Sequence, residues 1–234
     1  MIIEICANGF KSAQVAQNAG AQRMELCTNL SVGGLTPVHE EIEKVISKLT
    51  IPVHVLIRPR SGDFCYSEAE LATMIQDIAY CKQLGCAGVV SGVLTSEGNI
   101  DGTATTRLIA ASKGMDFTFH RAFDACTDWD EAFRFLLSSG VTRLLSSGQH
   151  AKAIDGIELL KKLKDRSQNK LQIMPGGGVN AENVMAFKEA GFDMIHFSAT
   201  QKNINTAEEE GMFSTETIGH SNQQVIQKIM ALLT

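Results

Sequence analysis

Two short segments of the chain each place a carboxylate and a thiol two residues apart. Glu4 and Cys6 close an apolar run that begins at Ile2, and Glu25 and Cys27 close a second run. If these runs are strands, side chains two residues apart share a face, so each strand directs a carboxylate and a thiol the same way. A buried carboxylate is costly unless it is paired, so two that face inward indicate a functional cavity.

The two thiols could bind a metal ion or simply pack beside a pocket. Adjacent strands lie about 4.8 Å apart, so Cys6 and Cys27 at matching heights could be bridged by one ion. Soft thiolates select Cu(I), and two ligands suit linear Cu(I) but not a tetrahedral structural zinc. Packing is the simpler interpretation, because a free cysteine behaves as a small hydrophobic residue. A hard divalent ion at Glu4 and Glu25 is a third interpretation, although no aspartate-rich cluster accompanies them.

The elements that must position these residues alternate regularly along the chain. Eight apolar runs predict strands, each followed by a helical pattern. Strict alternation favours a parallel sheet, and eight units in 234 residues predict a single-domain (β/α)8 TIM barrel over residues 1–234. A doubly wound open sheet is the rival, but it rarely repeats so evenly. The predicted strands are Ile2–Cys6, Gln22–Cys27, Val53–Ile57, Gly88–Ser91, Phe117–His120, Val141–Ser146, Leu171–Met174 and Asp193–Phe197.

Several helix boundaries follow from local signals. Thr36 before Pro37 predicts a helix start, Ser67 with Glu70 forms a capping-box pattern, and Asp128 is a predicted cap. Further helices are expected over residues 151–163, 180–190 and 223–233. Residues 201–222 are polar, without periodicity, and are predicted to be a loop before the last helix.

Charged and polar residues collect where the predicted strands end. In a TIM barrel the active face lies at the C-terminal ends of the strands. A barrel interior built only for stability would carry Val, Ile and Leu there, so we expect a ligand-binding mouth. Buried Glu–Arg pairs that only satisfy each other are the alternative. The residues concerned are Glu4, Glu25, Arg58, Arg60, His120 and His196.

A triple glycine follows the seventh predicted strand. Gly176, Gly177 and Gly178 allow close backbone approach just before a predicted helix, whose dipole favours anions. TIM barrels often bind phosphate in the loops after strands seven and eight, so we expect an anion site there, with a plain tight turn as the alternative. Arg58 and Arg60 are donors suited to carboxylate or phosphate.

The residue types at the strand ends favour acid–base chemistry. No predicted strand ends in a lysine, which disfavours Schiff-base aldolase chemistry. Glu25 is the expected base and His120 the expected acid, because histidine can titrate near neutrality.

Composition restricts the partners and the compartment. The chain has 21 Lys and Arg against 26 Asp and Glu, a net charge of −5, which disfavours nucleic acid as a partner. No apolar stretch approaches the roughly 20 residues that span a bilayer, and no signal peptide is recognisable. The six cysteines contain no Cys-x-x-Cys, so we expect free thiols in the cytoplasm.

Several longer motifs resemble the CutC family in register from residue 1 to about residue 200. They are Glu4-Ile-Cys6, Arg23-Met-Glu25-Leu-Cys27, Gly33-Gly-Leu-Thr-Pro37, Ile57-Arg-Pro-Arg60, Gly62-Asp-Phe-Cys-Tyr66, Phe119-His-Arg-Ala-Phe-Asp124 and Ser146-Ser-Gly-Gln149. The resemblance implies a (β/α)8 barrel, a cytoplasmic role in copper homeostasis, and a homodimer or higher homo-oligomer. The family's proposed Cu(I) ligands match Cys6 and Cys27.

Two functions are therefore expected. The first is a copper homeostasis protein of the CutC type that binds Cu(I) through Cys6 and Cys27. The alternative is a TIM-barrel enzyme that uses acid–base chemistry on a small anionic metabolite, a carboxylate or a phosphate. A barrel that acts only through protein contacts is a third interpretation, although no large exposed apolar patch is evident in the sequence.

Overall fold

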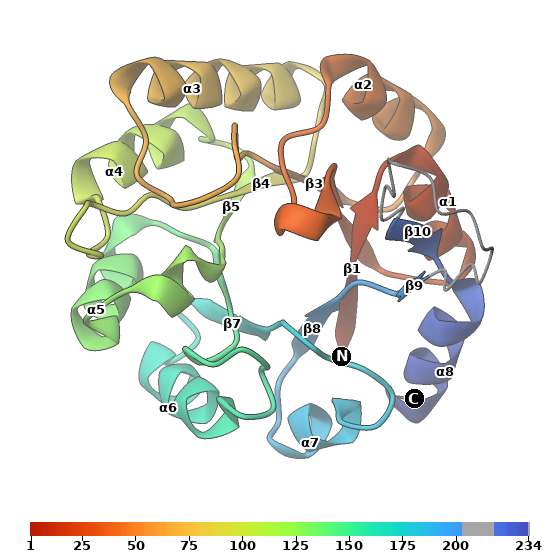
Figure 1. Cartoon of the computed structure of the whole chain (residues 1–234). Helices are drawn as coiled ribbons and strands as arrows, with labels where there is room; N and C mark the ends of the chain where they lie inside the picture. The colour runs from red at the N-terminus through yellow and green to blue at the C-terminus, as the bar shows by residue number, and fades with distance from the viewer. Residues whose placement is uncertain (203–217, 234) are drawn as a thin grey trace, which may run out of the picture.

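The protein is a parallel barrel of eight strands inside a ring of helices (Figure 1). The computed structural model describes residues 1–202 and 218–233. The strands are β1 (Ile2–Asn8), β2 (Arg23–Cys27), β3 (Val53–Leu56), β4 (Gly88–Ser91), β5 (Asp116–Phe119), β6 (Arg143–Ser146), β7 (Gln172–Pro175) and β8 (Met194–Phe197).

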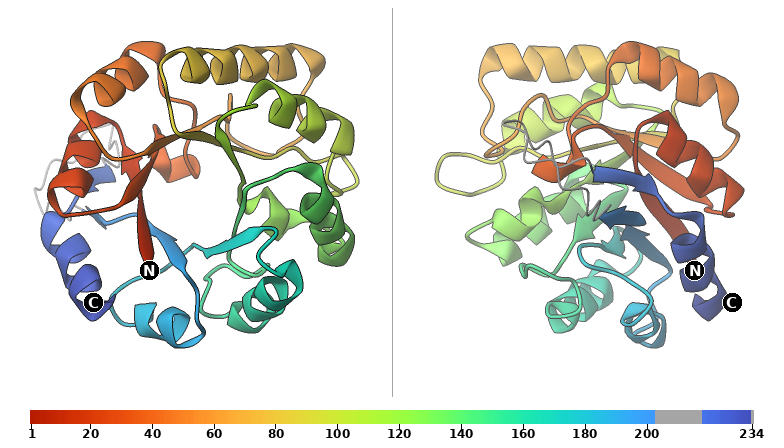
Figure 2. Two further views of the ribbon diagram at one scale, coloured as in Figure 1. Left: turned by 180° about the vertical axis from the view of Figure 1, so that it is seen from behind. Right: turned by 45° about the vertical axis from the view of Figure 1, so that its right-hand side comes forward.

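The strand order shows that the sheet closes on itself. Hydrogen-bonded neighbours run β7-β6-β5-β4-β3-β2-β1-β8, and a parallel bridge between Gly176 and His196 joins the two ends. The view from the opposite end shows the same ring (Figure 2, left). The predicted single-domain (β/α)8 barrel is confirmed, and the closure excludes the doubly wound open sheet.

The helices surround the strands and cover their outward faces. They are α1 (Phe10–Asn18), α2 (His39–Lys48), α3 (Glu68–Gln83), α4 (Gly102–Ala111), α5 (Trp129–Ser139), α6 (Ile157–Ser167), α7 (Val184–Glu189) and α8 (Gln223–Leu233), with 3-10 turns η1 (Leu30–Val32) and η2 (Arg121–Ala125). Within residues 1–202 and 218–233, no helix is both long and apolar enough to cross a lipid bilayer.

Two of the predicted caps are confirmed. The Ser67 hydroxyl accepts a hydrogen bond from the Glu70 N–H, and the Glu70 carboxylate accepts one from the Ser67 N–H, which completes the capping box of α3. The Asp128 carboxylate accepts from the N–H groups of Asp130 and Glu131 at the start of α5.

Three helices begin later than predicted, because side chains near the expected starts are used by the loops. α2 begins at His39, since the Thr36 hydroxyl accepts from the Arg58 N–H at 2.8 Å and so ties two loops together. α6 begins at Ile157, after a loop in which the Ser147 hydroxyl donates a hydrogen bond to the His150 carbonyl. α7 begins at Val184 and has only six residues.

The segment after β8 contains more regular structure than predicted. Strand β9 (Thr200–Lys202) pairs antiparallel with β10 (Ile218–Ser221), and the Ser221 N–H donates to Ser12 of α1 at 3.1 Å. The rest of the predicted polar loop, residues 203–217, lies outside the described residues. The predicted last helix over residues 223–233 is confirmed as α8.

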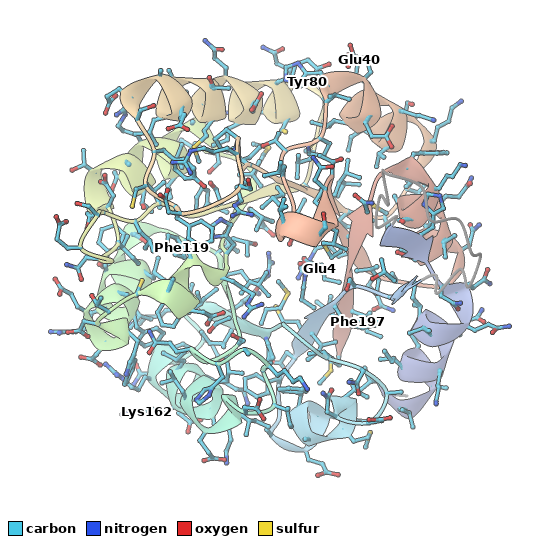
Figure 3. All side chains as sticks on the ribbon, viewed as in Figure 1. Glu4, Glu40, Tyr80, Phe119, Lys162 and Phe197 are labelled. Atoms are coloured by element: carbon cyan, nitrogen blue, oxygen red, sulfur yellow. The ribbon has the colours of Figure 1, made fainter. Side chains whose placement is uncertain are left out.

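The two faces of the strands differ in chemistry. Outward residues such as Ile5, Met24 and Val55 are fully buried in the main hydrophobic core, between strands and helices. The inward positions are instead largely polar and charged, and Glu4 lies inside the ring of strands (Figure 3). The barrel interior is therefore built for more than packing, since burying charges is costly unless they are paired.

Candidate functional site

Strand register brings the inward charges together. Glu4 of β1 is paired with Arg23 of β2 on one side and with His196 of β8 on the other, and Cys6 is paired with Glu25. Because side chains alternate along a strand, these residues all face the barrel interior, with Arg23 and His196 on either side of Glu4. Of the residues predicted to gather at the strand ends, the register thus brings Glu4, Glu25 and His196 together.

Glu4 is the most enclosed charge of the site. Its carboxylate accepts from Arg23 Nε at 2.5 Å and is bonded to His196 Nδ1 at 2.8 Å, and the side chain is fully buried. Burial alone would raise the pKa of Glu4, but His196, Arg23 and His54 outweigh it, so this pKa lies well below its ordinary range. Glu4 is therefore an ionised structural anchor.

A second group of charges lies beneath Glu4, toward the N-terminal end of the barrel. His54 Nδ1 lies 3.9 Å from Glu4, and Arg143 donates to Thr118 at 3.0 Å and to Asp116 at 3.2 Å. Burial, with Arg143 among the other contributors, lowers the pKa of His54 to about 4, although the carboxylates of Glu4 and Asp116 oppose the shift. His54 is therefore neutral at pH 7, and the positive charge of Arg143 is balanced by its ion pair with Asp116.

A cavity of about 540 Å³ opens above Glu4 at the C-terminal ends of the strands. This volume is within the usual range of small-molecule sites, about 300–1,000 Å³. Seven of the predicted site residues line it: Cys6, Glu25, Arg58, His120, Gly177, Gly178 and His196. Four predicted residues do not: Glu4 lies beneath the lining, Cys27 is fully buried outside it, Gly176 belongs to the bridge that closes the sheet, and Arg60 lies outside the cavity.

Glu25 is a buried carboxylate without a hydrogen bond to Oε2 from any described residue. Its nearest cation is His196, whose Nδ1 lies 3.8 Å from Oε2. Burial raises the pKa of Glu25 to about 7, with Glu4 adding to the rise and His196 opposing it. A carboxyl group with this pKa can exchange a proton near neutral pH.

The two histidines of the cavity have opposite protonation states. Burial alone would lower the pKa of His196, but Cys6, Glu25 and Glu4 raise it well above its ordinary value. Burial lowers the pKa of His120 to about 3, and the charge of Arg58 adds to the effect. His120 is therefore neutral at pH 7, and the expectation that it titrates near neutrality is wrong in this environment.

The two thiols of the Glu-x-Cys repeats meet at the base of the cavity. Their sulfur atoms are 3.5 Å apart, although the register pairs Cys27 with Asn8 and not with Cys6. The side chains thus bridge a two-residue difference in height, contrary to the expected matching heights. Only Cys6 lines the cavity, and both thiols pack against Leu56. The hydrogen bond with Cys27, and then burial, raise the pKa of Cys6 well above its ordinary value.

The thiol pair suits a soft ion better than the carboxylates suit a hard one. With metal–sulfur bonds of about 2.3 Å, a linear S–metal–S unit would separate the sulfurs by about 4.6 Å, so the thiols need to part by about 1 Å. Among the described residues, one set of three metal-ligating groups lies close together, namely Glu4, Glu25 and His196. Glu4 already binds Arg23 and His196, so that set is explained by ion pairing.

The two predicted anion-binding arginines have different surroundings. Arg58 is 5% exposed, and its Nη1 and Nη2 donate to the carbonyls of Val32, Gly34 and Gly62. Arg60 pairs with Glu70 at 2.6 Å and with Asp63 at 2.9 Å, and its side chain is 37% exposed. The charge of Arg60 is thus neutralised at the surface, whereas the charge of Arg58 is directed to the cavity wall.

The glycine loop contributes shape to the cavity. Gly177 and Gly178 have φ of 107° and 69°, which favours glycine, and a Cβ on Gly177 would lie 3.1 Å from the Arg121 guanidinium. Because α7 starts only at Val184 and is short, the predicted helix dipole directly behind the loop is absent. The cation there is Arg121, which pairs with Asp124 at 2.8 Å.

Sequence reasoning missed three residues of the site. Arg23 precedes Glu25 by two positions, so alternation alone would have placed it on the inward face. Arg121 follows His120 directly, within the Phe119-His-Arg-Ala-Phe-Asp124 motif, but the motif alone assigns it no role. Phe64 lines the cavity from the loop after β3, and the sequence marks it only as part of the Gly62-Asp-Phe-Cys-Tyr66 motif.

Comparisons with known proteins agree on one family. The model of the CutC family matches residues 1–201. A family protein CutC of Pasteurella multocida is 44% identical over 199 residues, which cover 85% of this chain and 82% of the relative. One of Bacteroides fragilis is 45% identical over 202 residues, 86% of this chain and 80% of the relative.

Solved structures give the same result. A CutC protein of Streptococcus agalactiae, described as a candidate copper homeostasis protein, superposes with a TM-score of 0.79 at 35% identity, covering 85% of this chain and 98% of that one. The N-(5'-phosphoribosyl)anthranilate isomerase of Pyrococcus furiosus has a TM-score of 0.57 at 14% identity, covering 100% of this chain and 98% of its own. The second likeness shows the barrel fold alone.

Proposed function

Because the chain belongs to the CutC family, we propose that it acts in copper homeostasis by binding Cu(I) through Cys6 and Cys27. The observation that carries the proposal is the 3.5 Å separation of the two buried sulfurs. Thiolates are soft ligands, and two of them suffice for Cu(I). Since Cys6 lines the cavity and Cys27 is fully buried outside its lining, an ion would meet Cys6 first.

Competition titration of Cu(I) against a chromophoric chelator tests this proposal. We expect the Cys6→Ser/Cys27→Ser variant to bind at least about 100-fold more weakly, because two hard hydroxyls replace two soft thiols. The Cys65→Ser/Cys126→Ser variant removes the same number of thiols elsewhere and should keep the wild-type affinity. Binding should also tighten as the pH rises, because both thiols must lose their protons. Equal affinity in the wild type and the Cys6/Cys27 variant would refute the thiol site.

The cytoplasmic location and self-association belong to the same proposal. All six cysteines are free, which suits a reducing compartment. The expectation of a homodimer or higher homo-oligomer comes from the family resemblance.

A second candidate function is favoured by the cavity itself. Two thiols do not require a 540 Å³ cavity with buried, unpartnered polar atoms on Glu25, Arg58 and His120. We propose an enzyme that acts by acid–base chemistry on a small anionic metabolite, a carboxylate or a phosphate, with Glu25 as the base. His120 would donate a hydrogen bond to the substrate, and Gly177 and Gly178 would allow close approach of an anionic group.

Thermal-shift measurements with a library of anionic metabolites test the enzyme proposal. A specific ligand stabilises the folded state by mass action, about 2.7 kcal/mol at a concentration 100-fold above its Kd. We expect at least one anion to raise Tm, and Glu25→Gln to bind it while losing its turnover. If Cu(I) raises Tm and no anion does, the enzyme proposal fails and the copper proposal stands.

A further inference from the structure

The ring of His120 is locked in one tautomer. Its Nδ1 accepts a hydrogen bond from the Ala122 N–H at 3.2 Å, at the start of η2. An N–H group can only donate, so Nδ1 carries the lone pair and Nε2 carries the hydrogen. The low pKa of His120 agrees with this, since the ring stays neutral at pH 7. His120 therefore presents a fixed, uncharged Nε2–H donor.

That donor has no acceptor among the described residues. Nε2 is buried without a hydrogen-bond partner, and leaving such a donor unsatisfied is destabilising. The ring lies against Phe64, at 4.9 Å between centroids, and edge-on to Phe119 at 6.1 Å. Gly92 fits closely beside it, because a Cβ there would lie 2.6 Å from Nδ1. Since His120 lines the cavity, the missing acceptor can come from a ligand.

Arg58 supplies a second unsatisfied donor, from a side chain that packs on the same Phe64 ring as His120. Its guanidinium carbon lies 5.0 Å from the centre of the Phe64 ring, so Arg58 and His120 both pack on this one side chain. Arg58 Nη1 and Nη2 donate to backbone carbonyls, the half-buried Tyr66 side chain interacts with the guanidinium, and Nε is buried without a partner among the described residues. Its positive charge therefore has no carboxylate partner among the described residues, and a buried charge calls for one.

The number of donors and the charge select the kind of anion. Arg58 and His120 together offer two free N–H groups and one positive charge. A carboxylate has two oxygens and one negative charge, so it matches both. A phosphate monoester carries nearly two negative charges and three terminal oxygens. The single charge and two N–H groups of Arg58 and His120 would leave some of this charge and some of these oxygens unpaired. The nearby charge of Arg121 is already neutralised by Asp124.

We propose that the cavity binds a small monocarboxylate, whose carboxylate oxygens accept hydrogen bonds from Arg58 Nε–H and His120 Nε2–H beside the Phe64 ring. This inference rests on the second proposed function and narrows its substrate class from anions in general to monocarboxylates. It also assigns His120 the part of a neutral donor that orients the ligand, in place of the acid expected from the sequence.

Titration of the wild-type protein with acetate, propionate and butyrate, monitored by NMR of the histidine ring nitrogens, tests the proposal. We expect a saturable shift of the His120 Nε2 resonance with each monocarboxylate and a weaker effect of inorganic phosphate or methyl phosphate at equal concentration. Arg58→Met should weaken monocarboxylate binding roughly 10-fold or more, as loss of a charged hydrogen bond predicts. Arg107→Met removes a surface arginine and should leave binding unchanged.

A second variant covers the case in which Arg58→Met does not fold. Gly92→Ala keeps both donors but displaces the His120 ring, and should also weaken binding several-fold. Tighter binding of phosphate than of monocarboxylates, or monocarboxylate binding that neither variant weakens, would overturn this inference while leaving the enzyme proposal intact. If no anion of any class shifts the resonance or Tm, the inference and the enzyme proposal both fail.

Discussion

Replacing Arg23 by methionine is expected to lower the free energy of unfolding by about 3–5 kcal/mol. Arg23 donates to the fully buried carboxylate of Glu4 at 2.5 Å. Methionine has a similar volume but no charge, so Glu4 would keep a buried negative charge with His196 at 2.8 Å and His54 at 3.9 Å as its remaining partners. Urea denaturation that reports both the midpoint and the slope measures the effect.

Two further variants make the Arg23 result specific. Arg107→Met breaks the exposed pair with Glu68 and should cost no more than about 1 kcal/mol. Adding Glu4→Gln to Arg23→Met removes the stranded charge and should recover part of the loss, because the penalty comes from the unpaired anion. A cost for Arg23→Met as small as that for Arg107→Met would show that the barrel interior does not depend on this ion pair.

Replacing Glu25 by glutamine is expected to stabilise the protein above pH 7 by about 3 kcal/mol relative to its effect below pH 4.5. Burial raises the pKa of Glu25 to about 7 in the folded state, against 4.5 as its model value. Below pH 4.5 the group is protonated in both states. As the pH rises from 4.5 to 7, the unfolded chain releases the proton and the folded protein retains it, so the wild type loses stability that glutamine keeps.

The pH dependence of unfolding measures this effect. The difference in unfolding free energy between Glu25→Gln and the wild type should grow from pH 4.5 to 7 and then level off. Glu158→Gln, on the exposed surface of α6, should run parallel to the wild type. If the curve of Glu25→Gln also runs parallel, the buried carboxyl is not held protonated by its surroundings.

Local patterns in the sequence were sufficient for the architecture. The alternation of strand and helix periods predicts eight βα units, and parallel units of this kind close into a barrel. The capping residues Ser67 and Asp128 were predictable because a cap is made by neighbours in the chain. The start of α2 was not, because Thr36 bonds to Arg58, a residue distant in the sequence.

The two Glu-x-Cys repeats show which features of the site can be predicted from the sequence. Alternation along a strand directs Glu4, Cys6, Glu25 and Cys27 into the barrel, and the strand ends predict a shared mouth. The same reasoning placed Arg58, His120 and His196 there, and all three line the cavity. Arg60 was misplaced because it lies in the loop after β3, where ion pairs with Glu70 and Asp63 hold it at the surface.

The charge state of each group depends on contacts between different strands and could not be predicted from the sequence. Glu4 and Glu25 stand in nearly the same local sequence, yet the pKa of Glu4 lies well below the usual range and that of Glu25 is about 7. Register sets Glu4 between Arg23 and His196 and sets Glu25 opposite the thiol of Cys6. Protonation depends on burial and on neighbouring charges, and those come from other strands, so no single segment could specify it.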